Sequence, residues 1–254
     1  MTKVGVMING HEYVDYIGDA LASVSMQTSA PDATIVVLDR PYEECLEVYR
    51  RLVSSYRHEV IVLNPEHGGG ISFSRNAGFY YLAQQGMDFV IPLDEDDIMN
   101  PSCIARTRQA IGLDPEISVH YWDWAEFGNR VSYNRCPEWT EKELYSHPFI
   151  ISSSAISVKM WQDIHDANGS GYDSLLTELG LRWEDYLFYL EGALLGHKMA
   201  RIGVGALTKV RRHGRTGTDI ANETVPEWRV YAEEKLETFY DRTDIFREAP
   251  VPES

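Results

Sequence analysis

The first hundred residues alternate between short apolar runs and longer amphipathic segments, and this alternation constrains the fold more than any other feature. Strands are predicted at the four apolar runs Val4–Ile8, Thr34–Leu38, Val60–Leu63 and Met87–Leu93. The segments between them have apolar residues at helical spacing: Tyr13–Met26, Glu43–Arg57 and Ile71–Gln85. This order predicts an α/β fold with a mainly parallel central sheet that is flanked by helices.

The second half of the chain has a less regular pattern. Helices are predicted at Pro101–Gly112, Trp183–Leu195 and Pro226–Tyr240. Strands are predicted at Ile117–Trp122, Arg130–Tyr133, Ile150–Val158, Met199–Val204 and Leu207–Arg211. Because we find no internal repeat, low-complexity tract or long linker, we expect a single domain over residues 1–254, with a division near residue 100.

The composition of the chain indicates which partners and which cellular location to expect. The chain has 23 Lys and Arg against 39 Asp and Glu, a formal net charge of −16. Such a surface repels nucleic acids and anionic membranes, so a nucleic-acid partner is not expected. No run reaches the roughly 20 apolar residues of a membrane span. Three scattered cysteines and an N-terminus that lacks the pattern of a signal peptide predict a cytoplasmic location.

Four consecutive acidic residues, Asp94 to Asp97, directly follow the last of the four apolar runs. Parallel sheets bind ligands at the carboxyl ends of their strands, which is where these acids are predicted to lie. Four neighbouring carboxylates repel one another unless a cation or solvent intervenes. Asp94 and Asp96 project from the same side of an extended segment, as metal ligands would. The alternative is a solvated acidic loop in which Asp96 or Asp97 caps the next helix.

Such a cluster favours a hard divalent cation, Mg²⁺ or Mn²⁺, which takes its remaining ligands from phosphate and water. We therefore predict a metal-assisted enzyme that acts on a phosphorylated donor.

Five further segments have motifs at the ends of the predicted elements. They are Ser23-x-x-x-Gln27-Thr28, the strand ending at Asp39, Gly68–Gly78 with Arg75-Asn76-x-Gly78, Glu184-Asp185 within Trp183–Tyr186, and the basic segment Lys209–Thr218. In this order they resemble glycosyltransferases of the GT-A fold, most closely family 2, over about Val4 to Thr218. That family consists of inverting enzymes that use nucleotide-diphosphate sugars. The resemblance implies a nucleotide-binding half at residues 1–100 and an acceptor-binding half at residues 101–254.

The resemblance also assigns residues to the donor. Its cofactor-binding residues are implied to be Asn9, Asp39, Arg75, Asp94, Arg211 and Arg212. The family usually has Asp-Asp-Gly-Ser after its second strand, whereas this chain retains only Asp39 and continues with Arg40-Pro41. This departure leaves open whether the donor is a UDP-sugar or a GDP-sugar. Arg75 is expected to reach the nucleotide or to brace Asp94.

The remaining implied roles concern the metal and the general base. Asp94 and Asp96 form a D-x-D motif that holds Mn²⁺ or Mg²⁺, with His213 as a third ligand or a phosphate donor. Asp185 is our first choice for the general base that deprotonates an acceptor hydroxyl, and Glu184 is the second. The simpler alternatives are that these carboxylates cap a helix and that the basic segment pairs with the acids of the protein itself.

Together these observations predict an inverting, metal-dependent glycosyltransferase that transfers a sugar to a carbohydrate or small hydroxylated acceptor. A sugar-phosphate nucleotidyltransferase would normally have a glycine-rich phosphate loop after the first strand, and Asn9-Gly10-His11-Glu12 does not provide one. A catalytically silent nucleotide- or carbohydrate-binding module remains the other alternative. The sequence does not identify the sugar, the acceptor or the oligomeric state.

Overall fold

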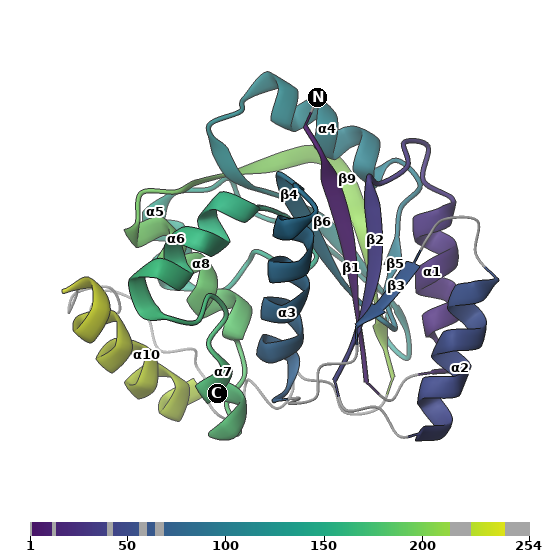
Figure 1. Ribbon diagram of the computed structural model, residues 1–254. Helices are drawn as coiled ribbons and strands as arrows, with labels where there is room; N and C mark the ends of the chain where they lie inside the picture. Colours follow the sequence, from purple (N-terminus) through teal and green to yellow (C-terminus); the bar gives the residue numbers. More distant parts are fainter. Residues whose placement is uncertain are drawn as a thin grey trace.

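The fold is built on one curved, mixed β-sheet with helices on both of its faces (Figure 1). The computed structural model describes residues 2–11, 14–39, 43–55, 60–63, 69–213 and 225–241. The strands run in the order β3-β2-β1-β4-β8-β6-β9-β5, and β7 pairs with β6. Their bounds are β1 Val4–Gly10, β2 Ala33–Leu38, β3 Val60–Leu63, β4 Phe89–Asp94, β5 Ile98–Met99, β6 Ile117–Gly128, β7 Ser132–Asn134, β8 Ala155–Ser157 and β9 Lys198–Arg212.

The parallel half of the sheet consists of the four strands predicted from the first hundred residues. β3, β2, β1 and β4 are parallel neighbours. Asn9 of β1 is in register with Asp94 of β4, and Gly10 is in register with Leu38 of β2. The carboxyl ends of these strands therefore lie at one edge, as the alternation of strands and helices predicts.

The other half of the sheet is mixed. β8 is antiparallel to both β4 and β6, β6 and β9 are parallel, and β5 is antiparallel to β9. The two predicted strands Met199–Val204 and Leu207–Arg211 are parts of the single long strand β9. Register shifts between β6 and β9 occur around Asp123, which is where β9 passes through Gly203 and Gly205. Gly205 has φ +94°, a conformation that glycine adopts without strain and that allows one irregular strand instead of two.

The predicted strand Ile150–Val158 is largely wrong, because only Ala155–Ser157 forms a strand. A helix begins at Val158, and the Ser157 hydroxyl caps it by accepting a hydrogen bond from the Met160 N–H at 3.1 Å. This local cap outweighs the strand preference of the β-branched residues. The sequence reasoning also missed two short helices, α5 at Glu141–Ser146 and α7 at Ser174–Glu178.

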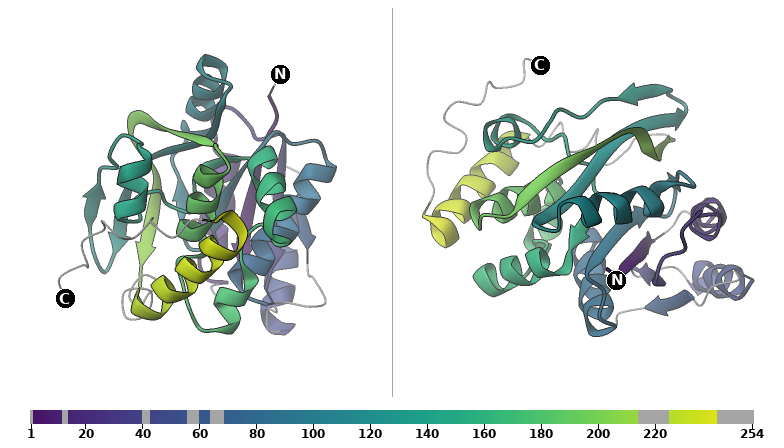
Figure 2. Two further views of the ribbon diagram at one scale, coloured as in Figure 1. Left: turned by 90° about the vertical axis from the view of Figure 1, so that its left-hand side faces the viewer. Right: turned by 90° about the horizontal axis from the view of Figure 1, so that it is seen from above.

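Helices cover the two faces of the sheet unequally (Figures 1 and 2). Their bounds are α1 Ile17–Ser25, α2 Glu43–Ser54, α3 Ile71–Gln84, α4 Cys103–Leu113, α5 Glu141–Ser146, α6 Val158–Asn168, α7 Ser174–Glu178, α8 Glu184–Leu194 and α10 Val225–Tyr240. Buried side chains of α1, α2 and α4 pack with Val6 and Ile8 of β1. Those of α3, α6, α8 and α10 pack with Met7 on the opposite face. The alternation along β1 is the period of two that a strand covered on both faces requires.

Gly78 brings α3 into close contact with the sheet. A Cβ atom at this position would lie 1.8 Å from Sδ of Met7 and 3.1 Å from Cγ2 of Val37. Both of these side chains are buried, so Gly78→Ala should lower the free energy of unfolding by about 1–3 kcal/mol. Gly112→Ala in α4 is the matched control, because nothing lies within 4 Å of its added Cβ, and it should be neutral or stabilising by up to about 1 kcal/mol. Urea denaturation of both variants measures the difference, and equal midpoints would contradict this packing.

Candidate active site

A cavity of about 470 Å³ opens at the carboxyl edge of β1 and β4. Its walls come from these strand ends, from the starts of α3 and α8, from residues 148–153 and from the end of β9. The structure thus brings together all but one of the site residues predicted from the sequence: Asn9, Arg75, Asp94, Asp96, Glu184, Asp185, Arg211, Arg212 and His213.

Asp39 is the exception among the predicted site residues. It follows β2, and its N–H donates a hydrogen bond to the carbonyl oxygen of Gly10 at 2.8 Å. It is therefore at the same edge of the sheet, but it does not line the cavity that the described residues form. Its neighbours Arg40 and Pro41, which replace Gly-Ser of the family motif, lie outside the described residues, as do Gly68 and residues 214–218 of the basic segment.

Arg75 connects the two sides of the cavity. Its side chain is buried, and Nη1 donates to Oε1 of Glu184 at 2.6 Å while Nη2 lies 3.6 Å from Oδ1 of Asp94. The guanidinium also lies over the ring of Tyr172. Burial alone would lower the pKa of Arg75, but Glu184 and Asp94 outweigh burial and raise it. Arg75 is thus a permanent cation that holds the end of β4 and the start of α8 together, the bracing role that the sequence offered for it.

The four acids of the cluster have different surroundings. Glu95 is buried and accepts hydrogen bonds from the His11 N–H and the Tyr49 hydroxyl. Asp97 is buried and accepts the Arg211 N–H at 2.9 Å. Burial, together with Asp94 and Asp96, raises the pKa of Asp97 well above its usual range. Asp97 starts no helix, because β5 follows it and α4 begins only at Cys103.

Asp96 lies against His213, the residue predicted to share a metal with it. Nε2 of His213 is 2.7 Å from Oδ2 of Asp96, and its ring packs 5.0 Å from that of Tyr16. Oδ1 of Asp94 is buried and accepts no hydrogen bond from the described residues. Among all the residues that the structure describes, no three His, Cys, Asp or Glu side chains are grouped closely enough to hold a metal ion alone. The donor set fits a Mg²⁺ or Mn²⁺ ion that takes most of its ligands from phosphate and water.

The basic segment pairs with acids of the protein itself. Arg211 Nη2 donates to Asp19 at 2.7 Å, and its guanidinium lies over the rings of Tyr16 and Phe127. Arg212 forms an ion pair with the buried Glu126 at 2.6 Å. Both arginines line the cavity, but their carboxylate partners neutralise much of their charge.

Asp185 and Glu184 occupy the first turn of α8, and their surroundings distinguish them. Glu184 is held by Arg75, whereas Asp185 has no ion pair with any described residue and only accepts the N–H of Tyr186 at 2.8 Å. Burial, and then the charge of Glu184, raise the pKa of Asp185 to about 7, although Arg75 opposes this shift. A carboxylate with a pKa near neutrality is suited to accept a proton from a substrate.

The residue before this pair has an uncommon backbone conformation. Trp183 has φ 64° and ψ 36°, in the left-handed region, and it is the N-cap of α8. Its ring packs edge-on against Trp228 of α10 at 5.4 Å and against Tyr186 at 6.1 Å. This conformation costs a non-glycine residue about 1–3 kcal/mol, which the packing against α10 must offset. α10 thereby supports the start of α8.

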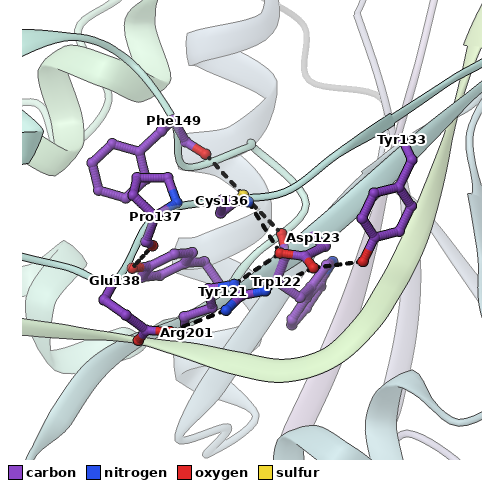
Figure 3. A network of polar contacts seen from close by, with 9 residues as sticks. All are labelled: Tyr121, Trp122, Asp123, Tyr133, Cys136, Pro137, Glu138, Phe149 and Arg201. Atoms are coloured by element: carbon purple, nitrogen blue, oxygen red, sulfur yellow. Dashed lines mark hydrogen bonds and ion pairs between the residues drawn. The ribbon is translucent and has the colours of Figure 1, made fainter.

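The sequence reasoning missed the wall at residues 148–153. Its anchor is a polar network on β6 and β9 (Figure 3), in which the buried Asp123 accepts two hydrogen bonds of 2.8 Å from Arg201. Asp123 also accepts the Cys136 N–H at 3.0 Å, and Sγ of Cys136 donates to the carbonyl oxygen of Phe149 at 3.2 Å. The available signal in the sequence was Asp123, an acidic residue within the otherwise apolar strand β6. Its partner Arg201 is 78 positions away, so the sequence alone did not reveal the network.

Comparisons with known proteins agree with this site. The model of the family described as "Glycosyl transferase family 2" matches residues 6–165. Since this is more than half of the chain, the protein belongs to glycosyl transferase family 2. Membership in this family favours a glycosyltransferase over a nucleotidyltransferase or a silent module. No curated protein matches the chain. No helix among the described residues is long and apolar enough to cross a membrane.

Solved structures show the same fold at low sequence identity. TarS 1–349 of S. aureus in complex with UDP-GlcNAc is 18% identical with a TM-score of 0.73, over 97% of this chain and 71% of that one. A structure of S. aureus TarS that is longer matches over 96% of this chain but only 44% of its own length. Mannosyltransferase PcManGT of Pyrobaculum calidifontis, in complex with GDP-Man and Mn²⁺, is 12% identical with a TM-score of 0.61. The match covers 98% of this chain and 66% of that one.

Removal of Arg75 tests its role as the connection between β4 and α8. Arg75→Met leaves Glu184 and Asp94 without their buried counter-charge and should lower the free energy of unfolding by about 3–5 kcal/mol. The double variant Arg75→Met/Glu184→Gln should lose at least about 1 kcal/mol less than the sum of the single variants, because the two residues interact directly. Arg106→Met on the exposed face of α4 is the control. Strict additivity in urea denaturation would contradict the proposed connection.

Proposed function

We propose that the protein transfers a sugar from a UDP or GDP donor to a hydroxyl of a carbohydrate or small hydroxylated acceptor, with inversion and with Mn²⁺ or Mg²⁺. The observation that carries this proposal is the ion-pair bridge of Arg75. It places the acids after β4 and the acids at the start of α8 around one cavity. A metal-binding group and a proton acceptor on opposite sides of a cavity are the parts that such a transfer requires.

On the donor side, Asp94 and Asp96, together with His213, would hold the metal, whose chemical contribution is to neutralise the diphosphate as it leaves. The contact between Asp96 and His213 and the buried Oδ1 of Asp94 support this assignment. The neighbour PcManGT is described with GDP-Man and Mn²⁺, and TarS with UDP and with UDP-GlcNAc.

The nucleoside of the donor would bind along β1 and β2. The side chain of Asn9 lines the cavity, is 5% exposed and lies next to Asp94 of the neighbouring strand. Its amide has hydrogen-bonding groups to offer a nucleotide as well as Asp94. Asp39 at the same edge would contact the base or ribose, and Arg75 would contact the donor through its remaining N–H groups. Arg211 and Arg212 would face the diphosphate, with their own carboxylate partners moderating the charge.

On the acceptor side, Asp185 would remove the proton of the acceptor hydroxyl as its oxygen forms a bond to the anomeric carbon. The bond from that carbon to the diphosphate breaks at the same time on the opposite face, so the configuration inverts. Asp185 suits this role better than Glu184, because Glu184 is engaged by Arg75.

A cytoplasmic location and the division into two halves near residue 100 are further parts of the proposal. Unpaired Cys45, Cys103 and Cys136 support a reducing compartment.

Substitution of Asp96 tests the metal site. Asp96→Asn should reduce transfer and donor hydrolysis by at least about a hundredfold, because electrostatic stabilisation of the leaving group contributes strongly to the rate of such a reaction. The free energy of unfolding should change by less than about 1 kcal/mol. The control is Asp166→Asn, whose side chain is 82% exposed on α6. The assay is release of UDP from UDP-GlcNAc and of GDP from GDP-mannose with added MnCl₂. Full activity of Asp96→Asn would refute the metal role of this residue.

The pH dependence of the reaction tests Asp185. The base must be deprotonated, so a pKa of about 7 predicts that kcat/KM rises with pH and levels off above neutrality. Asp185→Asn should remove this dependence and reduce kcat by about 10²–10⁴-fold. Because the folded pKa exceeds the unfolded value of about 4, the contribution of Asp185 to stability falls as pH rises through this interval. Asp185→Asn should therefore unfold at a higher temperature than the wild type at pH 8. A wild-type profile that is flat from pH 5.5 to 8.5 would exclude Asp185 as the base.

A further inference from the structure

Arg182 differs from the other arginines that line the cavity. Arg75, Arg211 and Arg212 each have a carboxylate partner, at 2.6, 2.7 and 2.6 Å respectively. Arg182 lines the same cavity and is half-buried, yet within the described part of the chain it has no ion pair, hydrogen bond or aromatic contact. It is thus a cation at a binding site whose charge no described protein group satisfies.

This lack of a partner is unexpected in so acidic a chain. Acids outnumber basic residues by 39 to 23, and six carboxylates line this cavity. A guanidinium that is partly withdrawn from water is normally paired, because the loss of hydration must be compensated. Its planar fork matches the oxygens of phosphate and carboxylate groups, which it binds with two parallel hydrogen bonds. The arrangement is that of an anion-binding group whose ligand comes from outside the protein.

The position of Arg182 indicates which substrate carries this anion. Four consecutive residues, Arg182 to Asp185, line the cavity, and the left-handed turn at Trp183 lies within them. Arg182 is therefore on the same segment as Asp185, the group assigned to the acceptor. The acids after β4 and His213, the groups assigned to the donor diphosphate, come from other elements. The wall at residues 148–153 contains no charged side chain.

We propose that the acceptor of this glycosyltransferase is anionic, with a phosphate or carboxylate close to the reacting hydroxyl, and that Arg182 binds that group. The proposal rests on the function proposed above, in which Asp185 receives the proton of the hydroxyl. Binding of the anion by Arg182 directs the neighbouring hydroxyl towards Asp185. Arg182 is thereby a specificity-determining residue and takes no part in proton transfer.

The test compares neutral acceptors with counterparts that have a phosphate or a carboxylate in place of one hydroxyl or hydroxymethyl group. Two sets are suitable: glycerol, glycerol 3-phosphate and glycerate; and galactose, galactose 6-phosphate and galacturonate. Transfer from UDP-GlcNAc and GDP-mannose to each is measured with MnCl₂, alongside hydrolysis of the same donors without acceptor. The phosphate and carboxylate members separate the two possible anions. The variants are Arg182→Gln and Arg182→Lys, with Arg106→Gln on the exposed face of α4 as the control.

The wild type should use at least one anionic acceptor with a kcat/KM about tenfold or more above that of its neutral counterpart. Arg182→Gln should raise the KM for that acceptor by about tenfold or more, a much larger change than in the KM for the donor. Arg182→Lys should recover part of the loss, because it keeps the charge but not the fork.

Three results would overturn the proposal: equal use of neutral and anionic acceptors, use of neutral acceptors alone, or an effect of Arg182→Gln on the KM for the donor instead of the acceptor. Failure of the function proposed above is distinguishable from all three. It would appear as a lack of donor hydrolysis in the wild type, before any acceptor is added.

Discussion

The buried ion pairs of Arg75 are the interaction on which the site depends. Three elements meet at this side chain: α3, which contains it, the end of β4 through Asp94, and the start of α8 through Glu184. Arg75 is 2% exposed, and a charge that is so deeply buried must be compensated, so the two carboxylates must stay in place. Because burial of the Arg75 charge is costly, the positions of Asp94 and Glu184 are fixed. The cavity lies between these two carboxylates. Asp185 then differs from an ordinary surface acid because burial raises its pKa.

The support around this centre comes from three separate parts of the fold. Gly78 allows α3 to lie against β1, which sets the depth at which Arg75 enters the site. α10 packs Trp228 against Trp183 and so holds the strained turn that precedes Glu184. The network around Asp123 and Arg201 anchors the wall that contains Phe149. Each of these supports acts through packing or buried hydrogen bonds. Each one holds in place an element that lines the cavity.

Much of the fold, and the position of the acids after β4 beside Asn9, could be predicted from the sequence, for a local reason. In a parallel sheet the register of one strand against the next places Asn9 beside Asp94, and the periodic apolar pattern reveals those strands. The rest depends on contacts between distant residues that no local pattern encodes. The helix at Val158 depends on one serine cap, and the partners of Arg211 and Arg212 are Asp19 and Glu126. The isolation of Arg182 is visible only once its surroundings are known.

We propose that the acids after β4 and His213 form a metal-dependent diphosphate site. Calorimetric titration of UDP and of GDP into the wild-type protein, first with MnCl₂ and then with EDTA, tests this proposal. We expect at least one of the nucleotides to bind about tenfold or more tightly with Mn²⁺, because the carboxylates of Asp94 and Asp96 would hold a metal that neutralises the diphosphate. Equal affinities with and without Mn²⁺, for the nucleotide that binds, would contradict this claim.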